Sequence, residues 1–168
     1  TFPDVLQFAE AIRKEHPKIK IAMGGIHPTT YYKEILTNCG DIDYVAIGEG
    51  EKSILKLVKC IEDNDYSNLK DIKSFAYRDE KGDVKFNLQK DYVDDLDTLP
   101  QPAWDLIDFK NYEMDLSSYY NPKNLVLKNK AALFSSRACP LACNFCDMFL
   151  VMGKKHRKRG IPKIVDEL

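Results

Sequence analysis

The feature that most constrains the fold is an alternation of helical and strand patterns near the start of the chain. Apolar residues recur at helical spacing in segments 1–17, 27–40 and 51–63, and short apolar runs at 18–25 and 43–51 separate them. Both short runs end in glycines. Helices that alternate with buried strands at this spacing are typical of a parallel sheet covered by helices. The sequence therefore predicts an α/β domain, and we expect further strands upstream because these elements are too few to close it.

Each helical segment has one apolar face that we expect to be buried in this domain. These faces hold Val5, Phe8, Ala9 and Ile12 in the first helix, Ile35 and Leu36 in the second, and Ile54, Leu57, Val58 and Ile61 in the third. Cys39 and Cys60 fall on the same helices, and we interpret them as buried structural thiols.

The pattern changes in the middle of the chain. Residues 72–88 alternate between apolar and polar side chains around a turn at "DEKG", which predicts a β-hairpin. Segment 94–112 contains two prolines and clustered aspartates and is interpreted as an ordered connector, with Trp104 packed against a domain face. A short apolar strand, "AALFSS", then leads into a cysteine-rich loop, and "KIVDEL" begins another helix.

Three parts follow from these patterns. We predict the C-terminal part of an α/β domain at 1–66, a hairpin and interdomain connector at 67–128, and the start of a second domain at 129–168. The chain begins without Met on one helix pattern and stops inside another, which we interpret as a fragment of a longer protein.

Composition limits the partners of this chain. Its 168 residues include 25 Lys and Arg and 26 Asp and Glu, and the resulting net charge of −1 gives no support to a nucleic-acid or anionic-membrane partner. No apolar stretch approaches the ~20 residues that span a bilayer, and no signal peptide opens the chain. We therefore expect a cytoplasmic protein whose thiols are kept reduced.

Three cysteines, Cys139, Cys143 and Cys146, lie close together in the stretch "CPLACNFC". In a reducing compartment such thiols more often hold metal or carry out redox chemistry than form disulfides. Unrelated buried thiols, or a disulfide with a spare cysteine, are alternatives. A closed zinc site needs a fourth ligand, which His156 could supply. An iron–sulfur cluster held by three thiolates leaves one iron open to a substrate such as S-adenosylmethionine.

The spacing C-x-x-x-C-x-x-C, with an aromatic residue before the last cysteine, resembles the signature of the radical S-adenosylmethionine enzymes. The resemblance implies that Cys139, Cys143 and Cys146 hold a 4Fe–4S cluster and that Phe145 lies against the adenine of S-adenosylmethionine. One electron from such a cluster splits S-adenosylmethionine into methionine and a 5′-deoxyadenosyl radical. The resemblance also implies that the cysteine loop follows the first strand of a partial (β/α) barrel.

The flanking segments resemble the radical S-adenosylmethionine subfamily in which a cobalamin-binding domain comes first, as in anaerobic magnesium-protoporphyrin ester cyclases. The matching stretches, in order, are "IAMGGIHPTT", "DYVAIGEGEKSILKLV", "LDTLPQPAWDLIDF" and "HRKRGIPKIVDEL". The resemblance implies a Rossmann-like cobalamin-binding domain with Gly24 and Gly25 near the cobalamin nucleotide tail and Gly48 and Gly50 in a second loop facing the cofactor. Ligands of α/β domains bind at the carboxyl ends of parallel strands, where glycine lets them approach the backbone. A tight turn is the other interpretation of Gly24 and Gly25.

Several neighbouring residues have simpler interpretations. Glu49 and Glu51 favour the N-terminus of a helix, and His27 is interpreted as a helix-start or surface residue. The D-x-H-x-x-G motif that holds cobalt in many cobalamin domains does not occur in the chain. Ala138 occupies a place where relatives commonly have glycine. A solvated basic run is formed by Lys154, Lys155, Arg157, Lys158 and Arg159.

These features predict a B12-dependent radical S-adenosylmethionine enzyme in the full-length protein. We do not expect this chain alone to be active, because it ends soon after Cys146. Methyl transfer to a small-molecule substrate and oxidative cyclisation of one both remain open, and the expected partner is a flavodoxin- or ferredoxin-type electron donor. The alternative is a non-catalytic zinc-binding module fused to an α/β ligand-binding domain.

Overall fold

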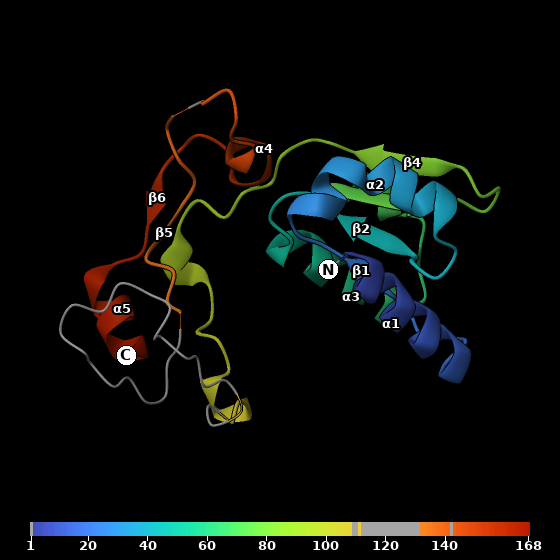
Figure 1. Ribbon diagram of the computed structural model, residues 1–168, viewed down its shortest axis with the longest axis horizontal. Coiled ribbons are helices and arrows are strands. Elements are labelled where there is room, and N and C mark those ends of the chain that lie inside the picture. The colour runs from blue at the N-terminus through green and yellow to red at the C-terminus, as the bar shows by residue number, and fades with distance from the viewer. Residues whose placement is uncertain (1, 109–110, 112–131, 142) are drawn as a thin grey trace. The chain divides into compact units, whose positions relative to one another are not determined.

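The structure is a computed structural model that describes residues 2–108, 111, 132–141 and 143–168. The end of the predicted connector, including the predicted boundary at residue 128, lies outside the described residues. None of the helices in the described ranges has the length and apolar character required to cross a membrane. Figure 1 shows the elements in chain order.

The chain divides into two compact units, which are described separately. The first comprises Thr1–Asp94 and Ala138–His156. The second comprises Asp95–Arg137 and Arg157–Leu168. The three cysteines of the "CPLACNFC" stretch therefore belong to the same unit as the α/β elements.

The three N-terminal helices form where the sequence predicts them. Helix α1 spans Phe2–Glu15, α2 spans Ile26–Asn38 and α3 spans Glu51–Glu62. Pro3 lies in the first turn of α1, where its missing N–H would have no helical partner in any case. A short fourth helix of this unit, α4, spans Met148–Met152 and follows the cysteines.

The sheet of the first unit begins with the parallel pair that the alternation predicts. Strand β1 (Ala22–Met23) lies parallel to β2 (Tyr44–Ala46), with Met23 opposite Val45. Two parallel strands joined through a helix form the β-α-β unit of α/β folds. The α/β class is thereby confirmed.

The predicted hairpin also forms, and it extends this sheet. Strand β3 (Phe75–Arg78) pairs antiparallel with β2 and with β4 (Val84–Asn87), giving the order β1-β2-β3-β4. A 3-10 turn, η1 (Leu69–Asp71), precedes the hairpin. The sheet is therefore mixed, with the hairpin on the far side of β2 from β1.

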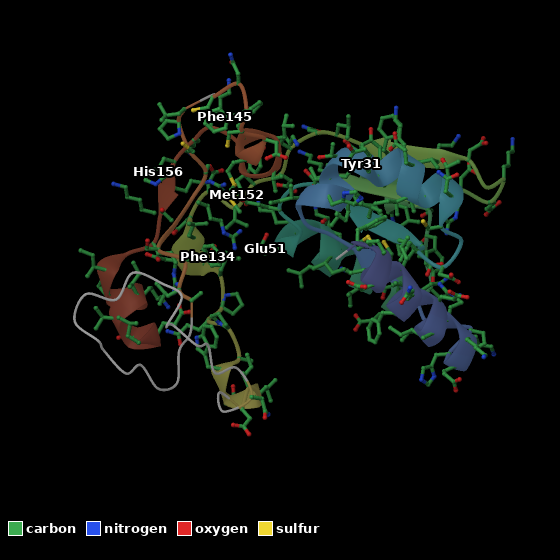
Figure 2. All side chains as sticks on the ribbon, viewed as in Figure 1. Tyr31, Glu51, Phe134, Phe145, Met152 and His156 are labelled. Atoms are coloured by element: carbon green, nitrogen blue, oxygen red, sulfur yellow. The ribbon has the colours of Figure 1, made fainter. Side chains whose placement is uncertain are left out.

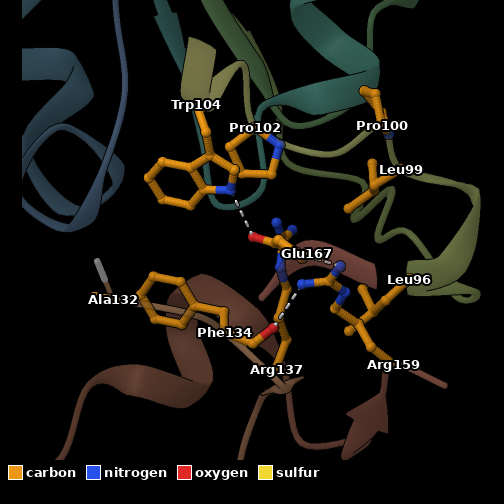
Figure 3. A pocket seen from close by; sticks show the side chains of 10 residues that line it. All are labelled: Leu96, Leu99, Pro100, Pro102, Trp104, Ala132, Phe134, Arg137, Arg159 and Glu167. Carbon is orange, nitrogen blue, oxygen red and sulfur yellow. Dashed lines mark hydrogen bonds and ion pairs between the residues drawn. The ribbon is translucent and has the colours of Figure 1, made fainter. Parts of the chain in front are cut away.

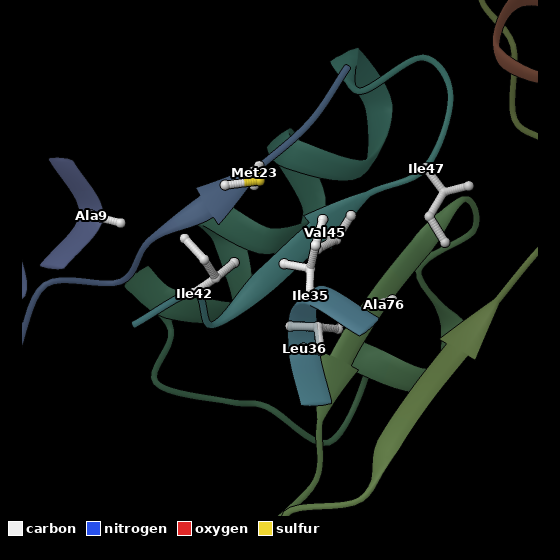
Figure 4. Close-up of a cluster of buried hydrophobic side chains, with 8 residues drawn as sticks. All are labelled: Ala9, Met23, Ile35, Leu36, Ile42, Val45, Ile47 and Ala76. Atoms are coloured by element: carbon white, nitrogen blue, oxygen red, sulfur yellow. The ribbon is translucent and has the colours of Figure 1, made fainter. Parts of the chain in front are cut away.

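Helices cover both faces of this sheet. Successive residues of β2 point to opposite faces, so Val45 and Tyr44 enter different clusters of buried side chains. The Val45 cluster, drawn in Figure 4, contains Ala9, Met23, Ile35, Leu36, Ile42, Val45, Ile47 and Ala76. The Tyr44 cluster contains Tyr44, Leu57, Leu69, Ile72 and Phe75. Residues of α1 and α2 thus pack on one face and Leu57 of α3 on the other.

Burial has a marked effect on Tyr44. Its ring stacks on that of Phe75, with 5.7 Å between ring centroids, and the residue is 6% exposed. Removal from water disfavours the phenolate, and this raises the pKa of Tyr44 to about 12.

The buried helix faces are narrower than predicted. Ile35 and Leu36 are fully buried as expected, but Phe8 of α1 is 68% exposed. Of the four apolar positions predicted on α3, only Leu57 is buried, and Ile54 and Val58 are exposed. Strands β1 and β2 contain two and three residues, so they offer little surface for the flanking apolar positions to cover. Val5 of α1 is exposed as well.

The second unit consists of short elements. These are η2 (Leu96–Thr98), η3 (Trp104–Leu106), β5 (Ser136–Arg137), β6 (Arg157–Lys158) and α5 (Ile161–Glu167). The helix predicted near the C-terminus is therefore confirmed.

The strand predicted at "AALFSS" begins later than expected. Residues 132–135 form no regular structure, and β5 pairs antiparallel with β6 only from Ser136 onward. The interpretation of this segment as the first strand of a (β/α) barrel remains a prediction.

The second unit is organised around a partly apolar pocket of about 260 Å³, shown in Figure 3. Trp104 and Phe134 form part of its wall. The Trp104 indole N–H donates to Glu167 Oε1 at 3.2 Å, and the Glu167 carboxylate pairs with Arg159 at 2.5 Å. Trp104 thus packs within the connector's own unit, through a partner that the sequence pattern did not indicate.

Candidate functional site

Two glycine loops lie at the same edge of the sheet. Gly24 and Gly25 follow the end of β1, and Gly48 and Gly50 follow the end of β2. Because β1 and β2 are parallel, their carboxyl ends meet at one edge. This is the edge at which open α/β sheets bind ligands.

Two of these glycines have backbone angles that favour glycine. The φ angle is 105° at Gly25, the N-cap of α2, and 81° at Gly48. A Cβ added to Gly25 would meet no atom within 4 Å, so that side of the loop is open. The positive φ angle alone therefore explains why glycine occupies position 25, in agreement with the tight-turn interpretation.

Gly24 and Gly50 have no such conformational requirement. Neither has a positive φ angle, and an added Cβ would contact Ala46 at the ordinary distances of 3.7 and 3.5 Å. Neither backbone angle nor crowding within the described residues demands glycine at these two positions. Close approach of a ligand is the explanation that remains, and it stays a prediction.

Thr29 joins the two glycine loops. Its Oγ1 donates to the Gly25 carbonyl at 2.7 Å and accepts from the Gly48 N–H at 2.8 Å. Thr29 is 7% exposed. The sequence analysis missed this residue, although its position in the first turn of α2, four residues after Gly25, was a usable signal because side-chain hydroxyls there reach the i−4 carbonyl.

Glu49 connects the second glycine loop to the segment after the hairpin. It is 7% exposed, and its Oε2 accepts from the Val93 N–H at 3.1 Å. Glu51 is the first residue of α3, where a carboxylate is favoured by the helix dipole, as predicted. Glu49 therefore has a structural role beyond the one expected for it.

The cysteine loop leads into α4. Cys139, Cys143 and Cys146 are free and half-buried, and the Cys146 N–H donates to the Cys143 carbonyl at 3.1 Å, which closes a turn between them. Ala138, just before the first cysteine, has a φ of 68°. A left-handed angle there explains physically why glycine suits this position.

Three thiols in one loop are the donor set that an iron–sulfur cluster with one open iron would take. In the part of the chain that the structure describes, no group of three or more His, Cys, Asp or Glu side chains is arranged to hold an ion, so the thiols share a loop without converging. The donor chemistry fits, and closure of the loop around a cluster would be required.

Phe145 lies where a ligand could reach it. The residue lies between the second and third cysteines in the sequence, and it is 92% exposed. Figure 2 labels its side chain. It lines an open hollow of about 620 Å³ together with Cys143, Cys146 and Phe149. A planar ring could stack on Phe145 there. Contact with adenine stays a prediction.

The remaining predicted residues have ordinary structural roles. His27 is exposed at the start of α2, with its ring between those of Phe2 and Tyr31, at centroid distances of 4.1 and 4.7 Å. This confirms its interpretation as a helix-start residue. Cys39 and Cys60 are half-buried rather than buried.

The basic run is not uniformly solvated, which corrects the prediction. Arg157 is 4% exposed, and the side chain of Arg159 is 15% exposed and pairs with Glu167. Lys155 pairs with Asp94 at 2.8 Å on the surface. The sequence shows the charges but not their partners, so burial of two arginines was not predictable from it.

Comparison with known proteins identifies the N-terminal part of the chain. Residues 1–58 match the B12 binding domain family. The chain is 31% identical to the anaerobic magnesium-protoporphyrin IX monomethyl ester cyclase of Synechocystis sp. over 144 residues, which are 86% of this chain and 26% of that protein. It is 27% identical to an uncharacterized methyltransferase of Pyrococcus horikoshii, over 98% of this chain and 33% of that protein. The chain thus spans about a quarter to a third of these relatives.

Two solved structures share the fold. The cobalamin-dependent S-adenosylmethionine radical enzyme OxsB, with aqua-cobalamin and S-adenosylmethionine bound, matches 98% of this chain and 20% of its own with a TM-score of 0.69 at 18% identity. The second is the radical S-adenosylmethionine methyltransferase TsrM from Kitasatospora setae, with cobalamin and a 4Fe-4S cluster bound. The match covers 98% of this chain and 30% of the TsrM chain, with a TM-score of 0.64 at 18% identity.

The parallel strand pair, its glycine-bearing edge and the family match define residues 1–58 as part of a Rossmann-like B12-binding domain. The relatives and structural neighbours extend well beyond that domain along the chain. The chain is thus similar, over most of its length, to a named cyclase and a named methyltransferase, and it shares its fold with cobalamin-bound radical S-adenosylmethionine enzymes.

Proposed function

We propose that this chain is the part of a B12-dependent radical S-adenosylmethionine enzyme that brings the cobalamin edge and the cluster loop together. Cys139, Cys143 and Cys146 would hold the 4Fe–4S cluster. The observation that supports this most directly is that three free, half-buried thiols occupy one loop in the unit that contains the glycine-bearing edge. The domain boundaries at 66 and 128 are part of the same proposal.

Each group of residues has a distinct task in this proposal. Cys139, Cys143 and Cys146 would hold a cluster whose chemistry, when reduced, would be one-electron cleavage of S-adenosylmethionine to methionine and a 5′-deoxyadenosyl radical. Three thiolates leave one iron open for S-adenosylmethionine, and the exposed ring of Phe145 offers a face for its adenine. Gly24, Gly25, Gly48 and Gly50 would leave the backbone of the sheet edge accessible to cobalamin.

The reaction class follows from the relatives and is proposed at that level. The similar proteins are named as a cyclase and as methyltransferases, so both methyl transfer and oxidative cyclisation of a small molecule are consistent with this chain. A 4Fe–4S cluster held by these thiols would need a low-potential electron donor to reduce it. A flavodoxin- or ferredoxin-type protein would fill that role.

Metal analysis of three chains tests the cluster. The unsubstituted chain, Cys143→Ser and Cys60→Ser are purified without oxygen, treated with iron and sulfide, and analysed for metal content and electron paramagnetic resonance after reduction. We expect about four irons in the unsubstituted chain and in Cys60→Ser, and near-complete loss in Cys143→Ser. Adding S-adenosylmethionine should shift the signal, because the cofactor binds the open iron.

The competing zinc module predicts different results in the same experiment. One tightly bound zinc per chain and no cluster signal would overturn the radical enzyme. Cys60→Ser is the matched control, because Cys60 is also free and half-buried but packs beside the Tyr44 cluster, away from the loop. Equal iron loss in both variants would mean that the thiols of the loop have no special role.

A further inference from the structure

Helix α4, which begins two residues after the third cysteine, rests directly on the second glycine loop of the same unit. A Cβ added to Gly48 would lie 2.9 Å from the carbonyl oxygen of Val151 in α4. Val151 itself is 5% exposed, and α4 also contacts α2. The main chains of α4 and the loop therefore lie so close together that residue 48 has no room for a side chain larger than hydrogen.

Two further contacts secure the end of α4. The Lys90 ammonium donates to the Leu150 carbonyl at 2.9 Å, and burial lowers the pKa of Lys90. Gly153 ends the helix with a φ of 75°, and a Cβ there would lie 2.9 Å from the ring of Tyr92. Lys90 and Tyr92 belong to the segment that follows the hairpin, so three separate segments of the unit hold α4.

The contact at Gly48 continues into the first glycine loop. The Gly48 N–H donates a hydrogen bond to Thr29 Oγ1, and the same hydroxyl donates one to the Gly25 carbonyl. A continuous path therefore runs from the Gly25 carbonyl through Thr29 and Gly48 to the main chain of α4. It contains one buried hydroxyl and otherwise only backbone atoms, so it has little rotational freedom.

We propose that Gly48 is a positioning residue, supported by Thr29, that fixes the cysteine loop at a set place on the glycine-bearing edge. This inference rests on the proposed function. Sites that act together must be held to within ~0.5 Å of their working geometry, and contacts between backbones meet this demand better than flexible side chains. Gly48 is thus required because α4 docks on it, whether or not it also faces a cofactor.

Gly48→Ala tests the docking, and Gly82→Ala is its matched control. Both glycines have similar positive φ angles, 81° and 86°, so alanine strains both backbones alike. A Cβ on Gly82 meets no atom within 4 Å, whereas one on Gly48 meets Val151. Hydrogen exchange of amides 149–153 should speed up by roughly tenfold or more in Gly48→Ala and stay at the unsubstituted rate in Gly82→Ala.

A distance measurement tests the positioning itself. A nitroxide on Cys146, in a chain whose other cysteines are serine, is paired with the cobalt of added cob(II)alamin, and the distance distribution is measured by double electron–electron resonance. We expect one narrow distribution in the parent chain and in Gly82→Ala. We expect a broader or displaced distribution in Gly48→Ala.

The outcomes separate this inference from the proposed function. If the parent chain binds no cob(II)alamin, the proposed function fails, and the exchange measurement still decides whether α4 docks on Gly48. If Gly48→Ala matches the parent in exchange and distance, or if both glycine variants change alike, the positioning role is overturned.

A second pair of variants covers the case in which Gly48→Ala does not fold. Thr29→Val removes the hydroxyl that links Gly25 to Gly48. Thr30→Val instead removes a neighbouring hydroxyl that donates to the Ile26 carbonyl of its own helix, at 3.3 Å. Thr29→Val should broaden the distance distribution and Thr30→Val should not. Identical distance distributions in the two threonine variants would contradict the role of the Thr29 hydroxyl in positioning the cysteine loop.

Discussion

Ala138 shows how one residue can carry strain next to the cysteine loop. Its φ of 68° lies in the left-handed region, where the Cβ of an L-residue crowds the following carbonyl. The position directly precedes Cys139, so the backbone turn there sets the direction in which the loop begins.

We predict that Ala138→Gly raises the free energy of unfolding by about 1 kcal/mol, because glycine adopts this angle without crowding. Urea titration of the purified chain measures the change. Ala22→Gly is the control, since Ala22 lies in extended strand β1 of the same unit and should lose stability instead. A loss of stability in Ala138→Gly would show that the left-handed turn is not strained.

At the scale of elements, Arg78 of β3 fixes the end of α2 to the sheet. Its guanidinium donates to the carbonyls of Leu36 at 2.7 Å, Cys39 at 3.4 Å and Gly40 at 3.2 Å, and also to that of Ile42. Carbonyls at a helix C-terminus lack helical partners, so one planar cation here satisfies several of them at once.

We predict that Arg78→Lys lowers the free energy of unfolding by about 2 kcal/mol, because an ammonium cannot reach this set of carbonyls and leaves some of them unsatisfied. Chemical denaturation followed by far-ultraviolet circular dichroism measures it. Lys81→Met, in the exposed turn of the same hairpin, should change stability by less than about 0.5 kcal/mol. Equal effects of the two substitutions would rule out the capping role.

At the scale of the whole molecule, the two units carry different spectroscopic reporters. The single tryptophan, Trp104, belongs to the second unit, whereas α1, α2 and α3 belong to the first. Fluorescence therefore follows the second unit, and circular dichroism at helical wavelengths follows mainly the first.

We predict that Glu167→Gln shifts the fluorescence transition to lower denaturant and leaves the circular dichroism transition nearly unchanged. The side chain of Glu167 is 3% exposed and paired with Arg159, and removing one partner of such a pair costs about 3 kcal/mol. Asp166→Asn, at an exposed neighbouring position of α5, should shift neither signal. Equal shifts of both signals in Glu167→Gln would mean that the chain unfolds as one cooperative block.

The sequence alone determined the elements and the donor chemistry. Apolar periodicity is a local property, so it located α1, α2, α3 and the β3–β4 hairpin, and glycines marked the ends of β1 and β2. The spacing of Cys139, Cys143 and Cys146 is also local, and it was enough to place three thiols in one loop. Each of these features depends only on residues that are neighbours in the chain.

Only the tertiary structure decided which distant residues meet. The exposure of Phe8, the burial of Arg157, the bridge made by Thr29 and the contact of Gly48 with Val151 all join or separate segments far apart in the sequence. Periodicity shows that a helix has an apolar face, but it carries no information on how wide a surface will cover that face. Packing between segments sets such contacts, and for that reason the docking of α4 became visible only once the chain was folded.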